Sequence, residues 1–231
     1  MLQLDHLMYR QDAFSLSAHW SVRPGAKVAI LGPSGCGKST LLSLIAGFLA
    51  PTQGRVMWAE QDLRDVRPGD RPLSILFQDQ NLFPHLTLFQ NLGLALRPDL
   101  RLSDAQRRMI LDALARVELT GMQDRKPGQV SGGQIARAAL ARSLLRQRPV
   151  LLLDEPFAAL GPALKSDMLG FVAEVAAESG TTVLMVTHDP HDAQSFADET
   201  VFVSDGVAGA PVPTADLFAN PTQALADYLG R

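Results

Sequence analysis

Cysteine is almost absent from this sequence: Cys36 is the single cysteine among 231 residues. One cysteine cannot form a disulfide within the chain, and it has no cysteine partner with which to build a zinc site. A fold without disulfides is typical of a reducing compartment. The sequence therefore predicts a cytoplasmic protein.

Long apolar runs and an excess of basic charge are absent as well. Charged residues interrupt the first twelve positions, where a signal peptide needs an apolar segment, and no stretch reaches the roughly 18 apolar residues that span a bilayer. Lys and Arg number 21 against 24 Asp and Glu. We expect the chain to be neither exported nor inserted alone, and to have no nucleic-acid partner, because broad attachment to nucleic acid needs a positive surface.

Strand-like and helix-like segments alternate along the chain. Continuous apolar runs predict parallel strands buried on both faces, at 27–31, 73–77, 150–153 and 181–186. Apolar and polar residues alternate in three other segments, 2–10, 13–22 and 55–60, as in half-exposed antiparallel strands. The sequence predicts an α/β fold with an additional antiparallel β layer.

Residues 86–148 carry helical periodicity with hardly any strand signal. Within 102–119 a common apolar stripe predicts core packing by Leu102, Met109, Ile110, Leu114 and Val117. We expect one domain, 1–231, in which the core and β layer occupy about 1–85 and 149–231. An inserted helical subdomain occupies about 86–148.

A glycine-rich segment, GPSGCGKST, follows the predicted strand 27–31 and leads into a helical pattern. It matches G-x-x-x-x-G-K-[ST], in which backbone N–H groups at a helix N-terminus face phosphates. Lys38 would reach the β and γ phosphates, and Ser39 would ligate Mg²⁺. The predicted nucleotide-binding residues of this P-loop are Gly32, Pro33, Ser34, Gly35, Cys36, Gly37, Lys38, Ser39 and Thr40.

Two adjacent carboxylates, Asp154 and Glu155, follow the predicted strand 150–153. Asp154 can hold Mg²⁺ through water, while Glu155 can orient or deprotonate an attacking water. A structural alternative is that both residues cap a helix that begins at Pro156. The P-loop elsewhere in the chain favours the phosphoryl-transfer interpretation.

Gln78 and His188 follow the two remaining parallel strands. Ligands of open α/β sheets bind beyond the carboxyl ends of the strands, so these side chains should converge with Lys38 and the two carboxylates. Each residue alone is weak evidence, but four strand ends carry side chains suited to phosphate or water. We predict hydrolysis of a terminal phosphate, with catalytic roles for Glu155, His188 and Gln78.

The segment 131–134, SGGQ, precedes a second helical pattern. Ser131 and Gln134 can form a capping box, which explains both of them structurally. Gly132 and Gly133 remain unexplained, because glycine in a first turn weakens a helix unless something must approach its backbone. They indicate a second anion site at a helix N-terminus.

These motifs, in this order and spacing, resemble the nucleotide-binding subunits of ATP-binding cassette (ABC) transporters over essentially the whole chain. The resemblance implies a P-loop NTPase (RecA-like) core that binds ATP and Mg²⁺, with Ser39, Gln78 and Asp154 at the metal. It implies a head-to-tail homodimer in which Ser131, Gly132, Gly133 and Gln134 meet the partner's ATP. Tyr9 would stack on adenine, although an aromatic residue at a strand end could equally be plain packing.

The same resemblance implies a position at the cytoplasmic face of the inner membrane, with transmembrane permease subunits and, indirectly, a periplasmic solute-binding protein as partners. Exposed Leu82, Phe83 and Leu86 beside Pro84 would receive the permease, or would instead seat the helical subdomain. Within the family, the chain looks most like the ATPase subunits of bacterial thiamine importers.

The sequence departs from the family pattern at Gly161, where an aspartate that helps connect the two ATP sites is usual, and more mildly at Val130. Three alternatives stay open: a short importer ATPase for another small solute, a non-transport cassette protein, and a binding module with little turnover. The motifs alone do not separate the first alternative from thiamine import.

Overall fold

The structure is a computed structural model and describes residues 1–79, 81–158 and 160–230. Its parallel strands are β3 (Lys27–Leu31), β6 (Leu73–Leu76), β7 (Val150–Asp154), β8 (Thr182–Val186) and β9 (Glu199–Ser204). They lie in the order β9-β3-β8-β7-β6, and every adjacent pair is parallel. The apolar runs predicted four of these strands. The fifth, β9, was not predicted.

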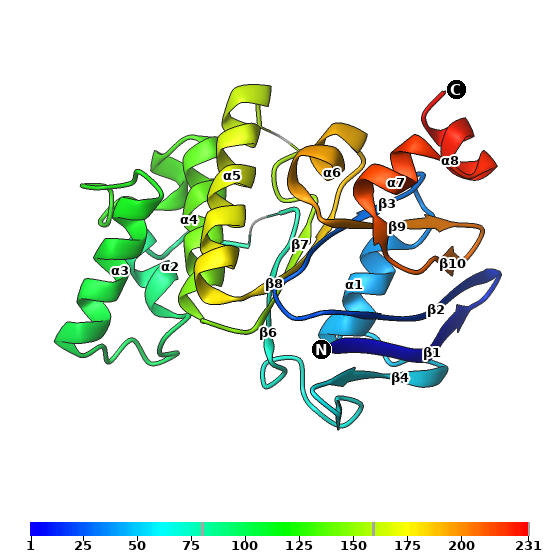
Figure 1. Cartoon of the computed structure of the whole chain (residues 1–231). Coiled ribbons are helices and arrows are strands. Elements are labelled where there is room, and N and C mark those ends of the chain that lie inside the picture. The colour runs from blue at the N-terminus through cyan, green and yellow to red at the C-terminus, as the bar shows by residue number, and fades with distance from the viewer. Residues whose placement is uncertain (80, 159, 231) are drawn as a thin grey trace.

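The antiparallel strands are β1 (Leu2–Gln11), β2 (Phe14–Val22), β4 (Gln53–Trp58) and β5 (Gln61–Asp62). The first three are the strands predicted from alternation. A short strand, β10 (Val207–Ala208), pairs with β2 on one side and with β9 on the other, while β11 (Val212–Pro213) also pairs with β9. The antiparallel layer therefore continues the parallel sheet through β10, as one curled mixed sheet (Figure 1).

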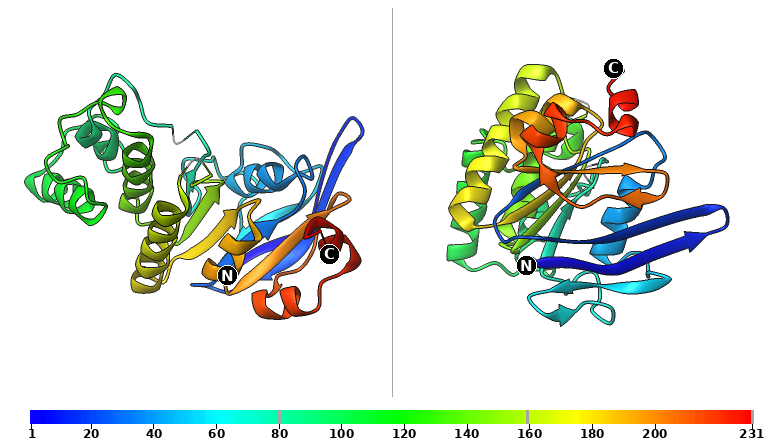
Figure 2. Two further views of the ribbon diagram at one scale, coloured as in Figure 1. Left: turned by 90° about the horizontal axis from the view of Figure 1, so that it is seen from above. Right: turned by 45° about the vertical axis from the view of Figure 1, so that its right-hand side comes forward.

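The helices are α1 (Lys38–Ala46), α2 (Leu88–Gly93), α3 (Asp104–Arg116), the 3-10 helix η1 (Pro127–Gln129), α4 (Gly132–Leu145), α5 (Pro162–Ser179), α6 (Pro190–Phe196), α7 (Thr214–Ala219) and α8 (Gln223–Tyr228). Figure 2 shows α2, α3 and α4 gathered at one end of the molecule, away from the antiparallel strands. Residues 86–148 contain no strand. No described helix is long and apolar enough to cross a membrane.

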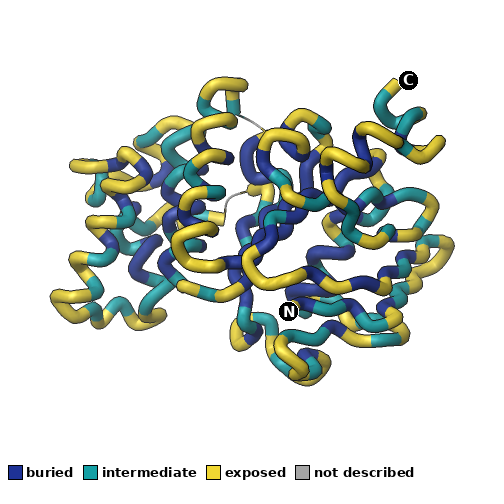
Figure 3. Tube along the Cα trace, viewed as in Figure 1, coloured by how far each residue is buried: buried dark blue, intermediate teal, exposed yellow. Residues whose placement is uncertain are grey.

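Burial follows the sequence patterns. The central parallel strands are almost wholly buried, and Figure 3 shows them as a dark interior beneath exposed helix surfaces. In the helical part, the predicted stripe is confirmed: Ile110, Leu114 and Val117 are buried, with Leu102 and Met109 packed against them. A capping box between Ser103 and Gln106 fixes where α3 begins. The sheet and these helices hold the loops at the carboxyl ends of the strands.

Candidate active site

The P-loop runs from the end of β3 into α1. Gly32 is required sterically, because a Cβ there would collide with the main-chain oxygen of Val203. Gly37 precedes α1 in a left-handed conformation, with φ of 106°, and no side chain caps the helix. The first N–H groups of α1 have no partner within the helix, so their dipoles favour an anion at this end.

Lys38 is buried inside the curve of this loop. Its side-chain Nζ donates to the main-chain oxygens of Gly32 at 2.7 Å and Pro33 at 2.8 Å. Pro33, Ser34 and Gly35 are exposed at the rim. The loop therefore holds a cationic side chain beside accessible backbone, as a phosphate cradle requires.

The P-loop helix meets the end of β7 through Ser39, whose hydroxyl donates to a carboxylate oxygen of Asp154 at 3.1 Å. Burial raises the pKa of Asp154 above its ordinary value, and the nearby Glu155 charge raises it further, against the bond from Ser39 and the charge of Lys38. A hydroxyl and a carboxylate are hard oxygen donors of the kind Mg²⁺ binds. These two residues fit a magnesium site.

Glu155 and His188 lie together beyond β7 and β8. His188 Nδ1 is 3.1 Å from a carboxylate oxygen of Glu155. Glu155 has a left-handed backbone, with φ of 45°, and its N–H donates to Val186 at 3.1 Å. The left-handed region is uncommon for a non-glycine residue, although nine other non-glycine residues among those described also adopt it. The helix after β7 begins at Pro162, so the alternative in which Asp154 and Glu155 cap a helix at Pro156 is wrong.

A cavity of about 40 Å³ lies beside this pair, lined by residues that include Glu155, His188, Lys165, Thr187 and Asp192. A single water needs only roughly 10–15 Å³ of such volume together with polar partners. The cavity therefore has room for water next to a carboxylate and an imidazole. Lys165, which the sequence analysis did not single out, forms ion pairs with Asp189, the N-cap of α6, and with Asp192 in its first turn.

Gln78 does not join these hydrogen-bonded pairs. Strand β6 ends at Leu76, and Gln78 lies two residues later in a turn, exposed. No hydrogen bond of its side chain is present among the described residues. Its place is at the same carboxyl edge of the sheet, because β6 runs parallel to β7.

Tyr9 lies on β1, half-buried, and its hydroxyl donates to Gln11 at 2.7 Å. Its ring packs edge-on against Phe14, with centroids 6.4 Å apart. Phe14 in turn faces the P-loop, because a Cβ at Gly37 would collide with its ring. Sequence analysis missed Phe14, whose only signal is an aromatic residue in a strand near the P-loop. Tyr9 therefore reaches the P-loop region through Phe14.

The segment 131–134 begins α4. Ser131 and Gln134 form the predicted capping box. Gly132 is exposed, and no atom of the described part of the chain lies within 4 Å of where its Cβ would be, whereas a Cβ at Gly133 would press on Leu164. Figures 1 and 2 show α4 in the helical end of the molecule, apart from α1. This chain therefore does not bring its own second glycine pair to its own P-loop.

The segment after Gln78 differs from the exposed surface predicted for it. Phe83 and Pro84 are exposed, but Leu82 and Leu86 are half-buried, and Leu82 packs against two core clusters. The expectation of exposed Leu82 and Leu86 is wrong, because buried Asn91 draws the loop onto α2. Its amide bonds main-chain atoms of Phe83, Leu86 and Thr87.

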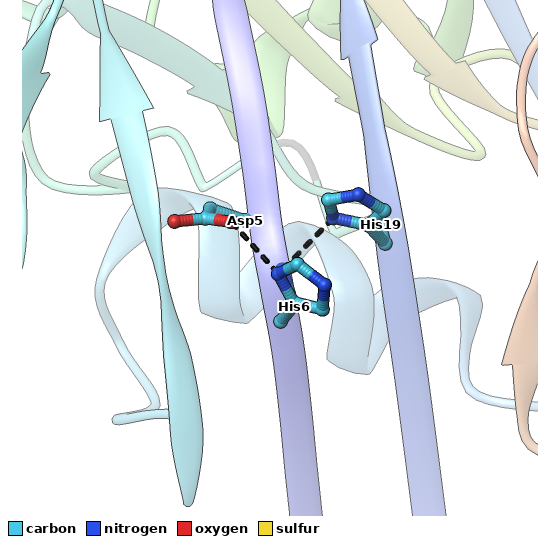
Figure 4. A group of neighbouring side chains, drawn as sticks. All are labelled: Asp5, His6 and His19. Atoms are coloured by element: carbon cyan, nitrogen blue, oxygen red, sulfur yellow. Dashed lines mark hydrogen bonds and ion pairs between the residues drawn. The ribbon is translucent and has the colours of Figure 1, made fainter.

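A cluster of two imidazoles and a carboxylate lies on β1 and β2, in the antiparallel layer (Figure 4). His6 Nδ1 bonds Asp5 at 2.9 Å, and the His6 N–H donates to His19 Nδ1 at 3.1 Å. Arg55 occupies the second oxygen of Asp5 at 2.9 Å. Because His19 Nδ1 accepts a hydrogen bond, the proton of its neutral form lies on Nε2, which then cannot ligate a metal. These bonds stabilise an irregularity of β1 instead.

Comparisons with known proteins agree with this geometry. The family model described as ABC transporter matches residues 16–158. The chain is 61% identical over 230 residues to a thiamine import ATP-binding protein of Cereibacter sphaeroides, with both chains covered completely. It is 48% identical over 227 residues to a protein of the same name from Yersinia pseudotuberculosis, covering 98% of this chain and 93% of the relative.

Solved structures give the same result. A dimeric ATP-binding cassette in a post-hydrolysis state, bound to ADP and Pi, superposes with a TM-score of 0.81 and 30% identity, covering 93% of this chain and 99% of that chain. The predicted α/β fold of a P-loop NTPase is thereby confirmed. On the family match, the relatives and this likeness, the chain belongs to the ABC transporter family.

Proposed function

We propose that this chain is the ATP-hydrolysing subunit of an importer for thiamine or thiamine phosphates. ATP hydrolysis is supported by two hydrogen bonds that lie at the same edge of the sheet. One joins Ser39 to Asp154, and the other joins Glu155 to His188. The first joins the P-loop helix to a metal-suited carboxylate. The second sets a base and an imidazole beside a cavity with room for water.

Each residue then has a separable role. The P-loop backbone and Lys38 bind the phosphates, while Ser39, Asp154 and Gln78 hold Mg²⁺, which neutralises phosphate charge when bound. Glu155 accepts a proton from the attacking water, and His188 orients that water and the terminal phosphate. The bond from the Glu155 N–H to the main-chain oxygen of Val186 ties the backbone of Glu155 to the end of β8, close to His188.

We further propose a head-to-tail homodimer that completes two ATP sites. Gly132 supports it: the glycine is exposed, and none of the described residues of its own chain would clash with a side chain there. A phosphate bound by a second chain and approaching the start of α4 would need the space that a side chain at position 132 would fill. The related cassette bound to ADP and Pi is dimeric.

Thiamine as the solute, and partners at the cytoplasmic face of the inner membrane, are inferred from the named relatives, which are thiamine import proteins. The partners would be permease subunits and, through them, a periplasmic solute-binding protein. The exposed Phe83 and Pro84 would contact the permease, and residues 86–148 would act as the helical subdomain of a single domain.

The ATPase test compares purified wild type with Glu155→Gln and with Glu174→Gln, a matched control on an exposed residue of α5. We expect phosphate release from wild type and the control only. Equal phosphate release by Glu155→Gln would refute the catalytic role of Glu155. If the wild type released no phosphate, the chain would instead be a module that binds ATP with little turnover.

The solute test measures uptake of labelled thiamine at low external concentration in cells that lack this protein. Complementation with wild type or Glu174→Gln should restore uptake, and Glu155→Gln should not. Uptake unchanged by the deletion would favour an importer for another small solute, while the ATPase assignment would stand on the first experiment.

A further inference from the structure

The last helix of the described chain reaches back to the candidate active site. Tyr228, at the end of α8, donates its hydroxyl to the main-chain oxygen of His188 at 2.6 Å. Forty residues separate the two positions in sequence. The short, charge-free bond therefore links the C-terminal helix to the loop that presents the imidazole.

The body of Tyr228 is fixed by packing. Its ring lies against Phe202 of β9, with centroids 5.7 Å apart. Phe202 pairs with Leu31, the residue immediately before the P-loop. Leu225 anchors α8 as a fully buried side chain, and Leu229 packs on the cluster that contains Leu31. The residues that hold Tyr228 in place therefore also pack against Leu31, where the P-loop begins.

His188 depends on its backbone for orientation. Its side chain is 62% exposed, so packing does not hold the imidazole, and its one side-chain bond to a described residue is to Glu155. The neighbours on both sides are fixed, since Thr187 bonds Asp192 at 2.8 Å and Asp189 caps α6. The bond from Tyr228 fixes the peptide between them.

We propose that Tyr228 is a positioning residue for ATP hydrolysis, which holds the main chain of His188 so that the imidazole stays beside Glu155. This inference rests on the proposed function. Burial raises the pKa of Tyr228, and the nearby carboxylates of Asp189 and Glu155 raise it further, so the hydroxyl keeps the proton it donates.

The test is Tyr228→Phe, which removes one oxygen and keeps the ring against Phe202. Loss of one hydrogen bond predicts a roughly three- to ten-fold fall in kcat, with KM for ATP and Tm near wild type. Gln223→Ala is the control, because it removes the 2.7 Å bond to Asp227 within α8 without touching His188. We expect the control to hydrolyse ATP like wild type.

A spectroscopic readout separates positioning from general loosening. In protein with ¹⁵N-labelled histidine, the His188 imidazole signal is assigned by its loss in His188→Ala. We expect Tyr228→Phe to shift this signal and to leave those of His6, His19 and His85 in place. An unmoved His188 signal, or unchanged kcat, would overturn the proposal. Failure of the wild type to exceed Glu155→Gln would instead refute the proposed function.

Discussion

The hydroxyl of Ser39, in the first turn of α1, donates to the carboxylate of Asp154 at the end of β7, across 115 positions of sequence. The bond joins the phosphate-binding helix to the strand that carries the acidic pair. Burial raises the pKa of this Asp154 carboxyl. Keeping the carboxylate charged at this position therefore lowers the stability of the folded chain.

Asp154→Asn should therefore stabilise the nucleotide-free protein while abolishing hydrolysis. A raised pKa means that ionised Asp154 is penalised in the fold above the ordinary aspartate value of about 3.9. The amide removes that penalty and still accepts from Ser39. We expect Tm to rise by a few degrees at pH 7, and the gain to vanish below about pH 4, where the wild-type carboxyl is protonated. Asp167→Asn, at an exposed site of α5, is the control. A lower Tm for Asp154→Asn at pH 7 would contradict this account.

Gly132→Ala, at the start of α4, should lower ATP hydrolysis without lowering the stability of the fold. The added methyl has open space, and alanine favours a helix over glycine by up to about 1 kcal/mol. We expect Tm to be unchanged or higher and ATP hydrolysis to fall, because the methyl blocks the partner's phosphate. Gly170→Ala, another exposed and unobstructed helical glycine, should gain similar stability with full activity. Full activity in Gly132→Ala would remove the argument for an anion there.

Local patterns predicted the strands and caps well. The apolar runs at 150–153 and 181–186 became β7 and β8 because a doubly buried strand has to be apolar throughout. Strand β9 was not predicted, because Glu199, Thr200 and Ser204 leave a continuous apolar run of only residues 201–203. Phe14 and Tyr228 were missed because their neighbours at the site are set by tertiary packing, and nothing in the adjacent sequence marks them.

Arg71 illustrates a further interaction that no motif predicts. Its buried guanidinium donates to the oxygens of Leu44 and Ile45 at the end of α1, and to those of Leu63 and Val66. Arg71→Lys keeps the charge but cannot span these acceptors. We expect a loss of about 1–3 kcal/mol in the free energy of unfolding, measured by urea denaturation, because buried carbonyls lose their partners. The exposed Arg67→Lys should be neutral, and equal midpoints for both variants would contradict the role.

Lys165 should make stability depend on pH. The hydrogen bond from Lys165 lowers the pKa of Asp189. Burial acts to lower the pKa of Lys165, but the bonds to Asp189 and Asp192 outweigh burial, so the pKa of Lys165 is raised. Lys165→Met should lower stability by about 2 kcal/mol near pH 7. The deficit should shrink below about pH 4, where Asp189 approaches protonation, and above about pH 10, where Lys165 approaches deprotonation. Thermal melts of both proteins across pH test this, and a deficit independent of pH would rule it out.

Gly161 stands where the family resemblance implies an aspartate, and the local structure predicts the effect of introducing one. Gly161 precedes α5 with extended dihedrals and no side-chain cap, and no atom of the described residues obstructs a Cβ. Gly161→Asp should therefore stabilise the fold by about 0.5–1 kcal/mol, through a less flexible unfolded chain and a capping oxygen. Gly161→Ala gives only the first contribution, so it separates the two in thermal melts. If the aspartate also connects the ATP sites of a dimer, Gly161→Asp alone should raise turnover and steepen its dependence on ATP concentration. If Gly161→Asp and Gly161→Ala hydrolyse ATP with identical kinetics, the aspartate acts only by capping α5.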